Sequence, residues 1–403
     1  MEKRLIELHV ENFRSLKKVT LPLGPLNVLV GANGAGKTNV LKVFDFLSDV
    51  IRTDLEPALQ ERGGFDEVVF WGGERPPASM KIRLKAAWTT HASRNAPDEY
   101  ELMVTRRGRS LSRKETFQFK RTQGRGRRIT ITGEQAAVID QNRQESQETL
   151  FGIHRLSSGL STLPRLSDNE GGTEVSTVAE RLASLRVFDV SVSLAREPSR
   201  INPSFLARVR RLARSALRDD ASNLAGFLFF LVQAHPDAFE QLQRDAAEVL
   251  PQLETIDFDF PSGAGREVIV VLRERGLRRP TPLADASYGT IRLLGLLALL
   301  HDPTPPALTC IEEIDHGLHP QALSLLVERL REAGERTQFL IATHSPALAD
   351  RLRPEELVVC RREGDGSSSI PALSTRQIND IVEASEGEPL GELWFAGALG
   401  GDL

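Results

Sequence analysis

The chain has few cysteines and no long apolar run. Cys310 and Cys360 are the two cysteines among 403 residues, and both fall in apolar, strand-like segments, so we expect reduced core residues rather than a disulfide framework or a redox site. The longest apolar runs, 293–300 and 227–232, are far shorter than the roughly 20 residues that a helix needs to cross a bilayer. The chain starts Met-Glu-Lys-Arg, without a signal-peptide pattern, which predicts a cytoplasmic protein with no membrane contact.

Repeats and metal-ligand clusters are also missing. No internal repeat is visible, and no segment sustains the heptads that long coiled-coil arms require. His316 and His319 lie beside Asp315, but no further ligand-like cluster accompanies them, so zinc is not expected. The net charge of -4, with 40% hydrophobic and 26% charged residues, indicates one large or two to three small globular domains.

A phosphate-binding loop is the most informative segment that is present. Residues 31–38 read Gly-Ala-Asn-Gly-Ala-Gly-Lys-Thr and fill every fixed position of the P-loop pattern. The apolar run 26–30 predicts a buried strand before the loop, and apolar residues at helical spacing over 40–47 predict a helix after it. Backbone N–H groups and the helix N-terminus suit phosphates, and we expect Lys37 to reach the terminal phosphates while Thr38 holds Mg²⁺. ATP and Mg²⁺ are therefore the expected cofactors. The expected nucleotide contacts in this segment are Gly31, Asn33, Gly34, Gly36, Lys37, Thr38 and Asn39.

Two further apolar runs end in residues suited to phosphate chemistry. Residues 308–311 precede Glu312-Glu313, a pattern typical of a Walker B strand, and we assign Glu312 to the magnesium shell and Glu313 to the polarisation of a water. Residues 338–343 precede His344, and the carboxyl end of a strand is where α/β sheets bind ligands. A neutral imidazole there can hydrogen-bond the γ-phosphate. Glu313 and His344 are the expected catalytic residues.

Taken together, these motifs resemble those of ABC-type ATPases of the RecF and SMC-like branch. The segment Ala-Ser-Tyr-Gly-Thr at 286–290, before a strongly apolar helix pattern, is similar to the family's signature motif, although Ala and Thr replace its usual leading Leu and trailing Gln or Glu. Residues 314–320 are similar to the D-loop of this branch, with Asp315 as the residue carried over. The segment Glu-Asn-Phe-Arg-Ser-Leu at 11–16 resembles an N-terminal segment whose Arg lies near the nucleotide, so Arg14 is a candidate phosphate contact.

The resemblance implies an α/β fold, an ABC-type P-loop ATPase head with an antiparallel β lobe and a mainly helical insertion. We expect a discontinuous ATP-binding domain at 1–140 and 255–403, with the insertion at 141–254. The resemblance also implies a head-to-head homodimer, in which the phosphate-binding and catalytic residues of one subunit face Ser287 and Gly289 of the other across ATP. Because only about 59 residues follow His344 (403 minus 344), too few for the Toprim nuclease domain of longer OLD-like relatives, we expect an effector such as a nuclease or toxin in trans.

The local patterns predict the remaining elements. Alternation of apolar and polar residues predicts strands of an antiparallel lobe, and apolar residues at helical spacing predict helices. Polar, Ser-rich sequence at 157–177 predicts a loop. The expected strands are 80–88, 99–105, 128–131, 256–260 and 268–272, and the expected helices of the insertion are 204–217 and 236–250.

Basic residues are concentrated between 106 and 128. They can neutralise nucleic-acid phosphates, or they can form a solvated hairpin face, and both interpretations stay open. Phe117 and Phe119 are expected to pack inward. The ten residues are Arg106, Arg107, Arg109, Arg113, Lys114, Lys120, Arg121, Arg125, Arg127 and Arg128.

These features favour an ATP-hydrolysing protein that couples its nucleotide state to the sensing of DNA or RNA, or to the control of an effector, in DNA repair or anti-phage defence. One alternative is a slow ATP-dependent scaffold or switch for a protein partner. A transporter ATPase subunit is disfavoured by the long insertion, the altered signature and the N-terminal segment.

Overall fold

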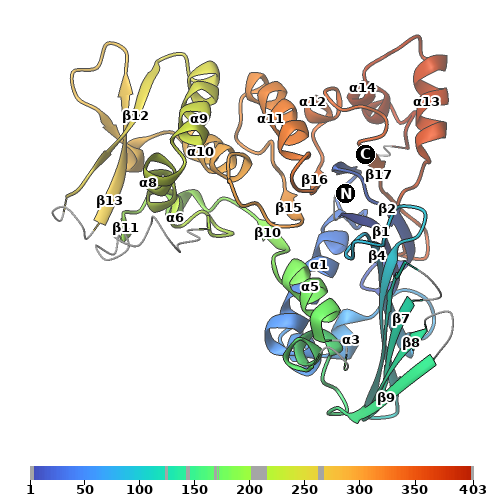
Figure 1. The fold of residues 1–403 in the computed structure, drawn as a ribbon. Helices are drawn as coiled ribbons and strands as arrows, with labels where there is room; N and C mark the ends of the chain where they lie inside the picture. Colours follow the sequence, from blue (N-terminus) through green and yellow to red (C-terminus); the bar gives the residue numbers. More distant parts are fainter. Residues whose placement is uncertain are drawn as a thin grey trace.

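The computed structural model describes residues 4–122, 126–141, 146–167, 170, 172–200, 216–261 and 267–400. Figure 1 shows three parts: a parallel sheet with helices around it, an antiparallel lobe below it, and a smaller lobe of helices and long strands to its side. Within these described residues, no helix is long and apolar enough to cross a membrane.

The five-stranded parallel sheet carries the phosphate-binding loop. Its central strands are buried along their whole length, as expected where helices cover both faces of a sheet. The loop after β3 leads into α1, and α10 and α11 flank β15 along the chain. The strand order is β10 (Arg186–Phe188), β15 (Thr309–Glu312), β16 (Phe339–Thr343), β3 (Leu26–Val30) and β17 (Leu357–Val359). The helices are α1 (Lys37–Thr53), α10 (Tyr288–Leu300) and α11 (Pro320–Ala333).

The antiparallel lobe is one eight-stranded sheet. Burial alternates strictly along β4, so one face of the sheet packs on a core while the other is solvated. α1 and α5 contribute to that core, and Figure 1 shows them beside the sheet. The strand order is β2 (Leu16–Pro22), β1 (Leu5–Phe13), β4 (Ser79–Ala86), β5 (Asp98–Arg107), β6 (Ser110–Phe119), β7 (Gly126–Thr132), β8 (Gln135–Gln141) and β9 (Ser146–Gly152). The helices of this lobe are α2 (Leu55–Gln60), α3 (Phe65–Val68), α4 (Gly159–Thr162), the 3₁₀ helix η1 (Leu163–Arg165) and α5 (Gly172–Ala183). All of them except α5 are short.

The third part packs two helices against a strand pair. The Phe229 ring meets those of Phe258 and Phe260 at 5.4 and 5.5 Å between centroids, and α10 contacts both helices, α8 and α9. The apolar core is therefore continuous from this lobe into the parallel-sheet part. Its elements are α6 (Val192–Ala195), β11 (Ser199–Arg200), α8 (Leu224–Ala234), α9 (Pro236–Val249), β12 (Leu253–Asp259), β13 (Glu267–Glu274), β14 (Thr281–Pro282) and the 3₁₀ helix η3 (Leu283–Asp285).

The C-terminal segment returns to the phosphate-binding loop. A two-stranded hairpin follows β17, and the backbone N–H of Ser368 in it donates to the carbonyl of Ser15 at 2.9 Å. This contact joins the hairpin to the N-terminal strands beside the loop. The elements are α12 (Pro346–Ala349), β18 (Arg361–Arg362), β19 (Ser368–Ser369), α13 (Thr375–Ala384) and α14 (Leu390–Phe395).

The strands and helices predicted from the sequence can be compared with those of the structure. The strands expected at 80–88, 99–105, 128–131, 256–260 and 268–272 are confirmed within a few residues, as is the helix expected at 236–250. The helix expected at 204–217 falls almost entirely outside the described residues. The loop expected at 157–177 is wrong, because α4, η1 and α5 occupy much of it.

The missed helix α5 buries a regular apolar face. Val175, Val178 and Leu182 are at most 1% exposed, at the spacing of one helical stripe. Polar and glycine residues before and between them hid this pattern in the sequence. The division at 141–254 remains a proposal, and two strands within it, β9 and β10, belong to the large sheets.

Candidate nucleotide-binding site

One cleft of about 280 Å³ gathers most of the expected site. It lies at the carboxyl ends of β3, β15 and β16, the edge where parallel sheets bind ligands. The segments that meet there are separated by up to about 330 residues in the chain and are brought together because β15, β16 and β3 are adjacent. The lining residues are Asn33, Gly34, Gly36, Lys37, Thr38, Asn39, Lys42, Glu312, Glu313, Ala342, Thr343, His344 and Arg362.

The loop backbone requires glycine at its bend. Gly34 and Gly36 have φ of 81° and 100°, in the left-handed region that side chains disfavour. A Cβ on Gly36 would overlap the hydroxyls of Ser368 and Ser15, so the C-terminal hairpin packs directly under the loop. Gly36 also precedes the first turn of α1, whose N-terminal N–H groups are an anion site.

Lys37 is held inside the loop. Its Nζ donates to the carbonyl of Gly31 at 2.7 Å and to that of Ala32 at 3.1 Å. Burial lowers the pKa of Lys37, and nearby negative groups, Glu313 and Glu312 among them, act in the opposite direction. A desolvated ammonium that still needs counter-charge fits the terminal phosphates of a nucleotide.

Glu312 and Thr38 form the pair expected at the metal. The Thr38 hydroxyl donates to the Glu312 carboxylate, which ends β15. Burial raises the pKa of Glu312, while Lys42 and the Thr38 hydrogen bond oppose that change. A half-buried carboxylate beside a hydroxyl is an oxygen donor set that Mg²⁺ accepts, so these residues fit the expected ion.

Glu313 points its carboxylate toward His344. Its Oε1 lies 3.6 Å from His344 Nδ1, and both side chains are about half exposed, at 51% and 52%. The Glu313 backbone adopts φ 48°, where a non-glycine residue is strained. Its N–H donates to the carbonyl of Ala342 at 2.8 Å, and Arg292 Nη2 donates to its carbonyl at 2.7 Å. These bonds fix the turn that aims the carboxylate into the cleft.

Three expected contacts, Asp315, Gly31 and Arg14, are not among the residues that line the cleft. The Thr343 hydroxyl donates to Asp315 Oδ1 at 2.7 Å, so Asp315 holds the end of β16. Gly31 contributes through its carbonyl to Lys37. Arg14 has φ 49° and its N–H donates to the carbonyl of Val68, and a nucleotide contact for its side chain stays a proposal.

The signature segment does not line the cleft of its own chain. Ser287 is exposed and caps α10 by accepting from the Thr290 N–H at 3.1 Å. A Cβ on Gly289 would crowd the Gly317 carbonyl, and the Tyr288 hydroxyl meets His316 Nδ1 at 3.3 Å. The signature and the D-loop therefore form one exposed surface, with an α10 N-terminus that suits an anion from another molecule.

Sequence reasoning missed three cations around the site. Lys42 lines the cleft from α1, four residues after Thr38 and so on the same face of the helix, and that spacing was the available signal. Arg362 Nη1 donates to the Gly34 carbonyl at 3.2 Å, and nothing in the sequence links these positions. Arg292 is 3% exposed inside an otherwise apolar helix face, and that isolated charge was a signal not used.

The basic segment at 106–128 is not one continuous basic surface. Arg113 and Arg127 are 1% and 8% exposed. Arg127 pairs with Asp140 at 2.8 Å and with Glu174 at 2.9 Å. Neither open interpretation, a phosphate-neutralising surface or a solvated face, applies to these two arginines, because both are buried inside the lobe.

The remaining part of that segment keeps some exposed charge. Phe117 and Phe119 pack inward as expected, each at 0% exposure. Arg125 lies outside the described residues, so nothing is concluded for it. The exposed cations of the segment include Arg107, Arg109, Lys114 and Arg128.

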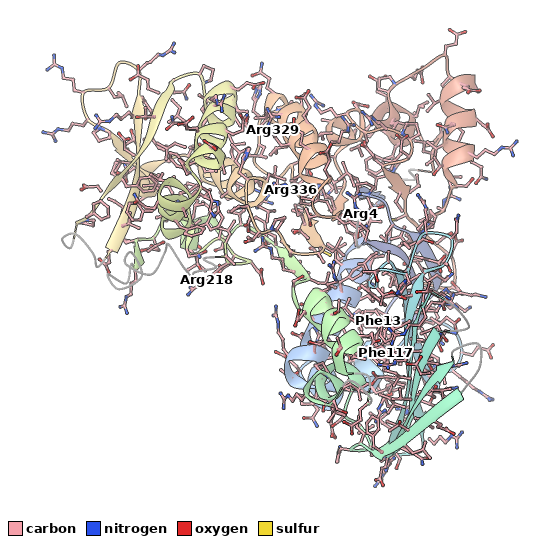
Figure 2. The ribbon with its side chains drawn as sticks, viewed as in Figure 1. Arg4, Phe13, Phe117, Arg218, Arg329 and Arg336 are labelled. Carbon is pink, nitrogen blue, oxygen red and sulfur yellow. The ribbon has the colours of Figure 1, made fainter. Side chains whose placement is uncertain are left out.

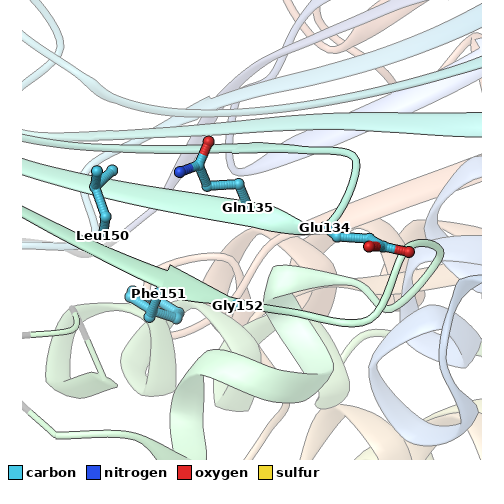
Figure 3. Close-up of a pocket in the computed structure, with 5 residues that line it drawn as sticks. All are labelled: Glu134, Gln135, Leu150, Phe151 and Gly152. Carbon is cyan, nitrogen blue, oxygen red and sulfur yellow. The ribbon is translucent and has the colours of Figure 1, made fainter.

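Another hollow, beside β8 and β9, has a different character. Figure 3 shows Glu134, Gln135, Leu150 and Phe151 around it. Leu150 is 57% exposed, and none of the described residues that line the hollow is basic. These described residues carry none of the cations that phosphate binding needs.

The sheet order, the loop before α1 and the paired acids after β15 define an ATPase head of the ABC type, and solved structures share this fold. The structure titled "Crystal structure of the SmcHead bound to the C-winged helix domain of ScpA" has a TM-score of 0.55 and 13% identity, over 94% of this chain and 99% of that one. An Smc head domain with an extended coiled coil, bound to a ScpA domain derived from Pyrococcus furiosus, has a TM-score of 0.53 and 12% identity, over 96% and 100%. The expected fold class is confirmed.

The chain belongs to the family described as "AAA domain, putative AbiEii toxin, Type IV TA system", whose model matches residues 26–350. It is 24% identical to the OLD nuclease of Thermus scotoductus over 383 residues, which are 90% of this chain and 62% of that protein. It is 38% identical to the DNA replication and repair protein RecF of Myxococcus xanthus over 85 residues, 21% of this chain and 20% of that protein. The chain thus spans less than two thirds of either relative. The expected resemblance to the RecF and SMC-like branch is confirmed.

Proposed function

We propose that this protein hydrolyses ATP with Mg²⁺ and uses the nucleotide to join two copies of itself. The observation that carries the proposal is the single cleft that holds Lys37, Thr38, Glu312, Glu313 and His344 at one sheet edge. A phosphate-binding cation, a metal-binding pair, a carboxylate and an imidazole are the groups that phosphoryl transfer to water requires.

Each side chain has a separate task in this proposal. Lys37 and the first N–H groups of α1 bind the β- and γ-phosphates. Thr38 and Glu312 hold Mg²⁺, which supplies charge neutralisation on the phosphate oxygens when bound. Glu313 accepts a hydrogen bond from the attacking water and orients its lone pair toward phosphorus. His344 donates to the γ-phosphate and so responds to its presence.

The dimer in this proposal rests on the exposed signature surface. Ser287 and Gly289 lie at the start of α10 and do not line the cleft of their own chain, and a helix N-terminus suits the γ-phosphate held by another copy. ATP then stabilises the pair and hydrolysis weakens it. Asp315 lies beside this surface and joins it to the end of β16 through Thr343.

The biological setting follows from the named relatives and remains part of the proposal. The OLD nuclease and RecF relatives support a role in DNA repair or anti-phage defence, with control of an effector such as a nuclease or toxin in trans, or the sensing of DNA or RNA. The altered signature, with Ala286 and Thr290, supports a second candidate, a slow nucleotide-dependent switch for a protein partner.

Turnover separates the two candidates. Phosphate release from saturating Mg²⁺-ATP should be sustained over many turnovers in the parent chain and lost in Lys37→Ala, which removes the phosphate-binding ammonium. The matched control is Lys18→Ala, an exposed lysine on β2. A single turnover followed by a stable nucleotide complex would support the slow switch, and equal turnover in Lys37→Ala would contradict the assignment of this cleft.

A further inference from the structure

The chain after β17 runs alongside the phosphate-binding loop. β17 pairs in parallel with β3, and just past the ends of both strands Cys360 packs so closely on the loop that a Cβ on Gly31 would overlap its carbonyl. Two residues further on, Arg362 Nη1 donates to the Gly34 carbonyl at 3.2 Å. The chain therefore follows the loop from its first glycine to its bend, where it places Arg362.

The hairpin β18–β19 holds two side chains against the loop. Its strands pair Arg362 directly with Ser368, and side chains that lie opposite each other on antiparallel strands share one face of the sheet. Ser368 packs under Gly36, and Arg362 contacts Gly34. Arg361 precedes Arg362 on β18, and successive side chains of a strand point to opposite faces. The hairpin therefore presents Arg362, and not Arg361, to the loop.

The position of this hairpin is fixed by buried contacts. The Ser15 hydroxyl accepts from the Ser368 hydroxyl at 2.7 Å and from the Asn39 side-chain amide at 2.8 Å, so one group joins the hairpin to the first turn of α1. Ser15 follows β1 closely, and the last residue of β1, Phe13, is 0% exposed in the core that α1 shares with the antiparallel sheet. Figure 2 labels Phe13 in this region. A hairpin held in this way is preorganised beside the loop.

Arg362 lines the same cleft as the groups assigned to the terminal phosphates. Lys37, Glu313 and His344 are among the other lining residues. Each of the four residues follows a different strand of the parallel sheet, and these strands, β15, β16, β3 and β17, are adjacent in that order. The carboxyl edge of the sheet therefore collects one such side chain from each strand. Arg362 is the member of this group that has no task in the proposed hydrolysis.

A guanidinium suits this position chemically. It stays charged at all working pH values and carries five N–H donors in a planar fork, and the bond to Gly34 uses one of its nitrogens. The same side chain can therefore hold the loop and donate to a phosphate oxygen. Guanidinium groups match the geometry of phosphate oxygens. During phosphoryl transfer, negative charge spreads over three oxygens of the γ-phosphate, where an added cation stabilises it.

We propose that Arg362 donates to the γ-phosphate of bound ATP and stabilises the charge on it during hydrolysis. The inference rests on the proposed function of the cleft and adds a residue that acts in it. The competing role is structural, with the bond to Gly34 acting only as a brace for the loop. A brace supports ADP and ATP alike, because both nucleotides bind through the loop. A γ-phosphate contact supports ATP alone.

Nucleotide affinity separates the two roles. All variants are full chains that carry Glu313→Gln to slow hydrolysis, and isothermal titration calorimetry measures their binding of Mg²⁺-ATP and Mg²⁺-ADP. Arg362→Gln should weaken ATP binding at least tenfold, because a charged hydrogen bond is lost, and should leave ADP binding within about twofold. Equal losses for ATP and ADP, or an unchanged affinity for ATP, would overturn the proposal.

The matched control is Arg361→Gln, which removes the neighbouring charge on β18. Arg361 is exposed and lies beside Gly400, so both affinities should stay within about twofold of the parent. Thermal unfolding shows whether each variant keeps the fold. If Arg362→Gln does not fold, Arg362→Lys replaces it, and its loss of affinity should still be larger for ATP than for ADP, since an ammonium keeps the charge but not the planar fork.

Two more measurements separate this proposal from that of the cleft as a whole. With Glu313 intact, Arg362→Gln should hydrolyse saturating ATP about 100-fold more slowly. Lys37→Ala should lose ATP binding. If Lys37→Ala binds ATP as the parent does, the cleft is not the nucleotide site and both proposals fail. If Lys37→Ala loses ATP while Arg362→Gln binds it as the parent does, the role of Arg362 alone is overturned.

Discussion

His344 Nδ1 lies 3.6 Å from Glu313 Oε1, and the two side chains face the cleft from the ends of neighbouring strands. In the proposed function, His344 senses the γ-phosphate and Glu313 orients the attacking water. Arg292, buried beneath them, holds the Glu313 carbonyl at 2.7 Å and so supports the strained turn. In the proposed mechanism, nucleotide sensing and water activation therefore depend on the same few atoms.

The first prediction concerns assembly. In a chain carrying Glu313→Gln to slow hydrolysis, Mg²⁺-ATP should shift the mass measured by light scattering from monomer to dimer. Ser287→Arg should abolish the shift, because a bulky cation would occupy the space that the phosphate of the other copy needs.

The control for this prediction is Ser374→Arg. Ser374 caps α13 as Ser287 caps α10, so the cost of losing a cap, typically about 1 kcal/mol, is matched. An ATP-dependent dimer that persists in Ser287→Arg would contradict the proposed dimer, in which ATP lies between the two copies. If the parent is already a dimer without nucleotide, cysteine crosslinking between position 287 of one copy and position 34 of the other replaces the mass measurement. The absence of a crosslink would then contradict the proposed dimer.

The second prediction concerns pH and the buried Glu115. Burial raises the pKa of Glu115 from 4.5 to about 7, against the opposing effects of Arg113 and of hydrogen bonds from Gly159 and Ser158, while Asp54 raises it further. Between these two pH values the folded chain keeps a proton that the unfolded chain has released. Stability therefore falls as pH rises through this window, by roughly 3 kcal/mol at most.

Glu115→Gln should remove that component, because the amide oxygen still accepts hydrogen bonds but does not ionise. Urea unfolding at pH 5 and pH 8 should then show a smaller loss of stability on raising the pH than in the parent. Glu101→Gln on β5, a partly exposed glutamate 3.9 Å from Lys81, is the control and should keep the parent's pH dependence. An unchanged pH dependence in Glu115→Gln would refute the account of Glu115.

The third prediction concerns nucleic acid. Arg127 is not a useful target for this test, because Asp140 and Glu174 engage its guanidinium. If the exposed part of the segment contacts duplex DNA, the triple variant Arg107→Ala, Arg109→Ala and Arg128→Ala should flatten the dependence of log K on log salt by up to about three. Fluorescence anisotropy across a salt series measures this slope.

The control is the pair Arg278→Ala and Arg279→Ala, which removes exposed charge from another lobe. Its slope should match that of the parent. Salt-insensitive binding, or an equal slope in the triple variant, would remove this segment as a nucleic-acid surface and favour a protein partner.

The position of the cleft could be predicted from the sequence, because each of its motifs is a short local segment that follows a strand of one parallel sheet. Residues 31–38, Glu312 and His344 each follow an apolar run, and once those runs are adjacent strands their ends meet at one edge. The roles assigned to these residues stay predictions, but their positions relative to one another required only strand type and order.

Other features depend on packing that no local pattern carries. Arg362 donates a hydrogen bond to Gly34, 328 residues away in the sequence. Arg127 donates one to Glu174, 47 residues away. Neither partner could be predicted from sequence spacing. β10 has three residues, too few to show a period. α5 was missed because polar residues dominate its exposed side, although its buried stripe is regular.

The most direct test of the central claim is single-turnover hydrolysis of radiolabelled ATP by Glu313→Gln, with nucleotide binding measured on the same sample. Because Glu313 is assigned only to the water, the variant should bind Mg²⁺-ATP as the parent does and hydrolyse it about 100-fold more slowly, whereas Lys37→Ala should fail to bind. Hydrolysis by Glu313→Gln at the parent rate, with binding intact, would contradict the account of this cleft as the hydrolytic site.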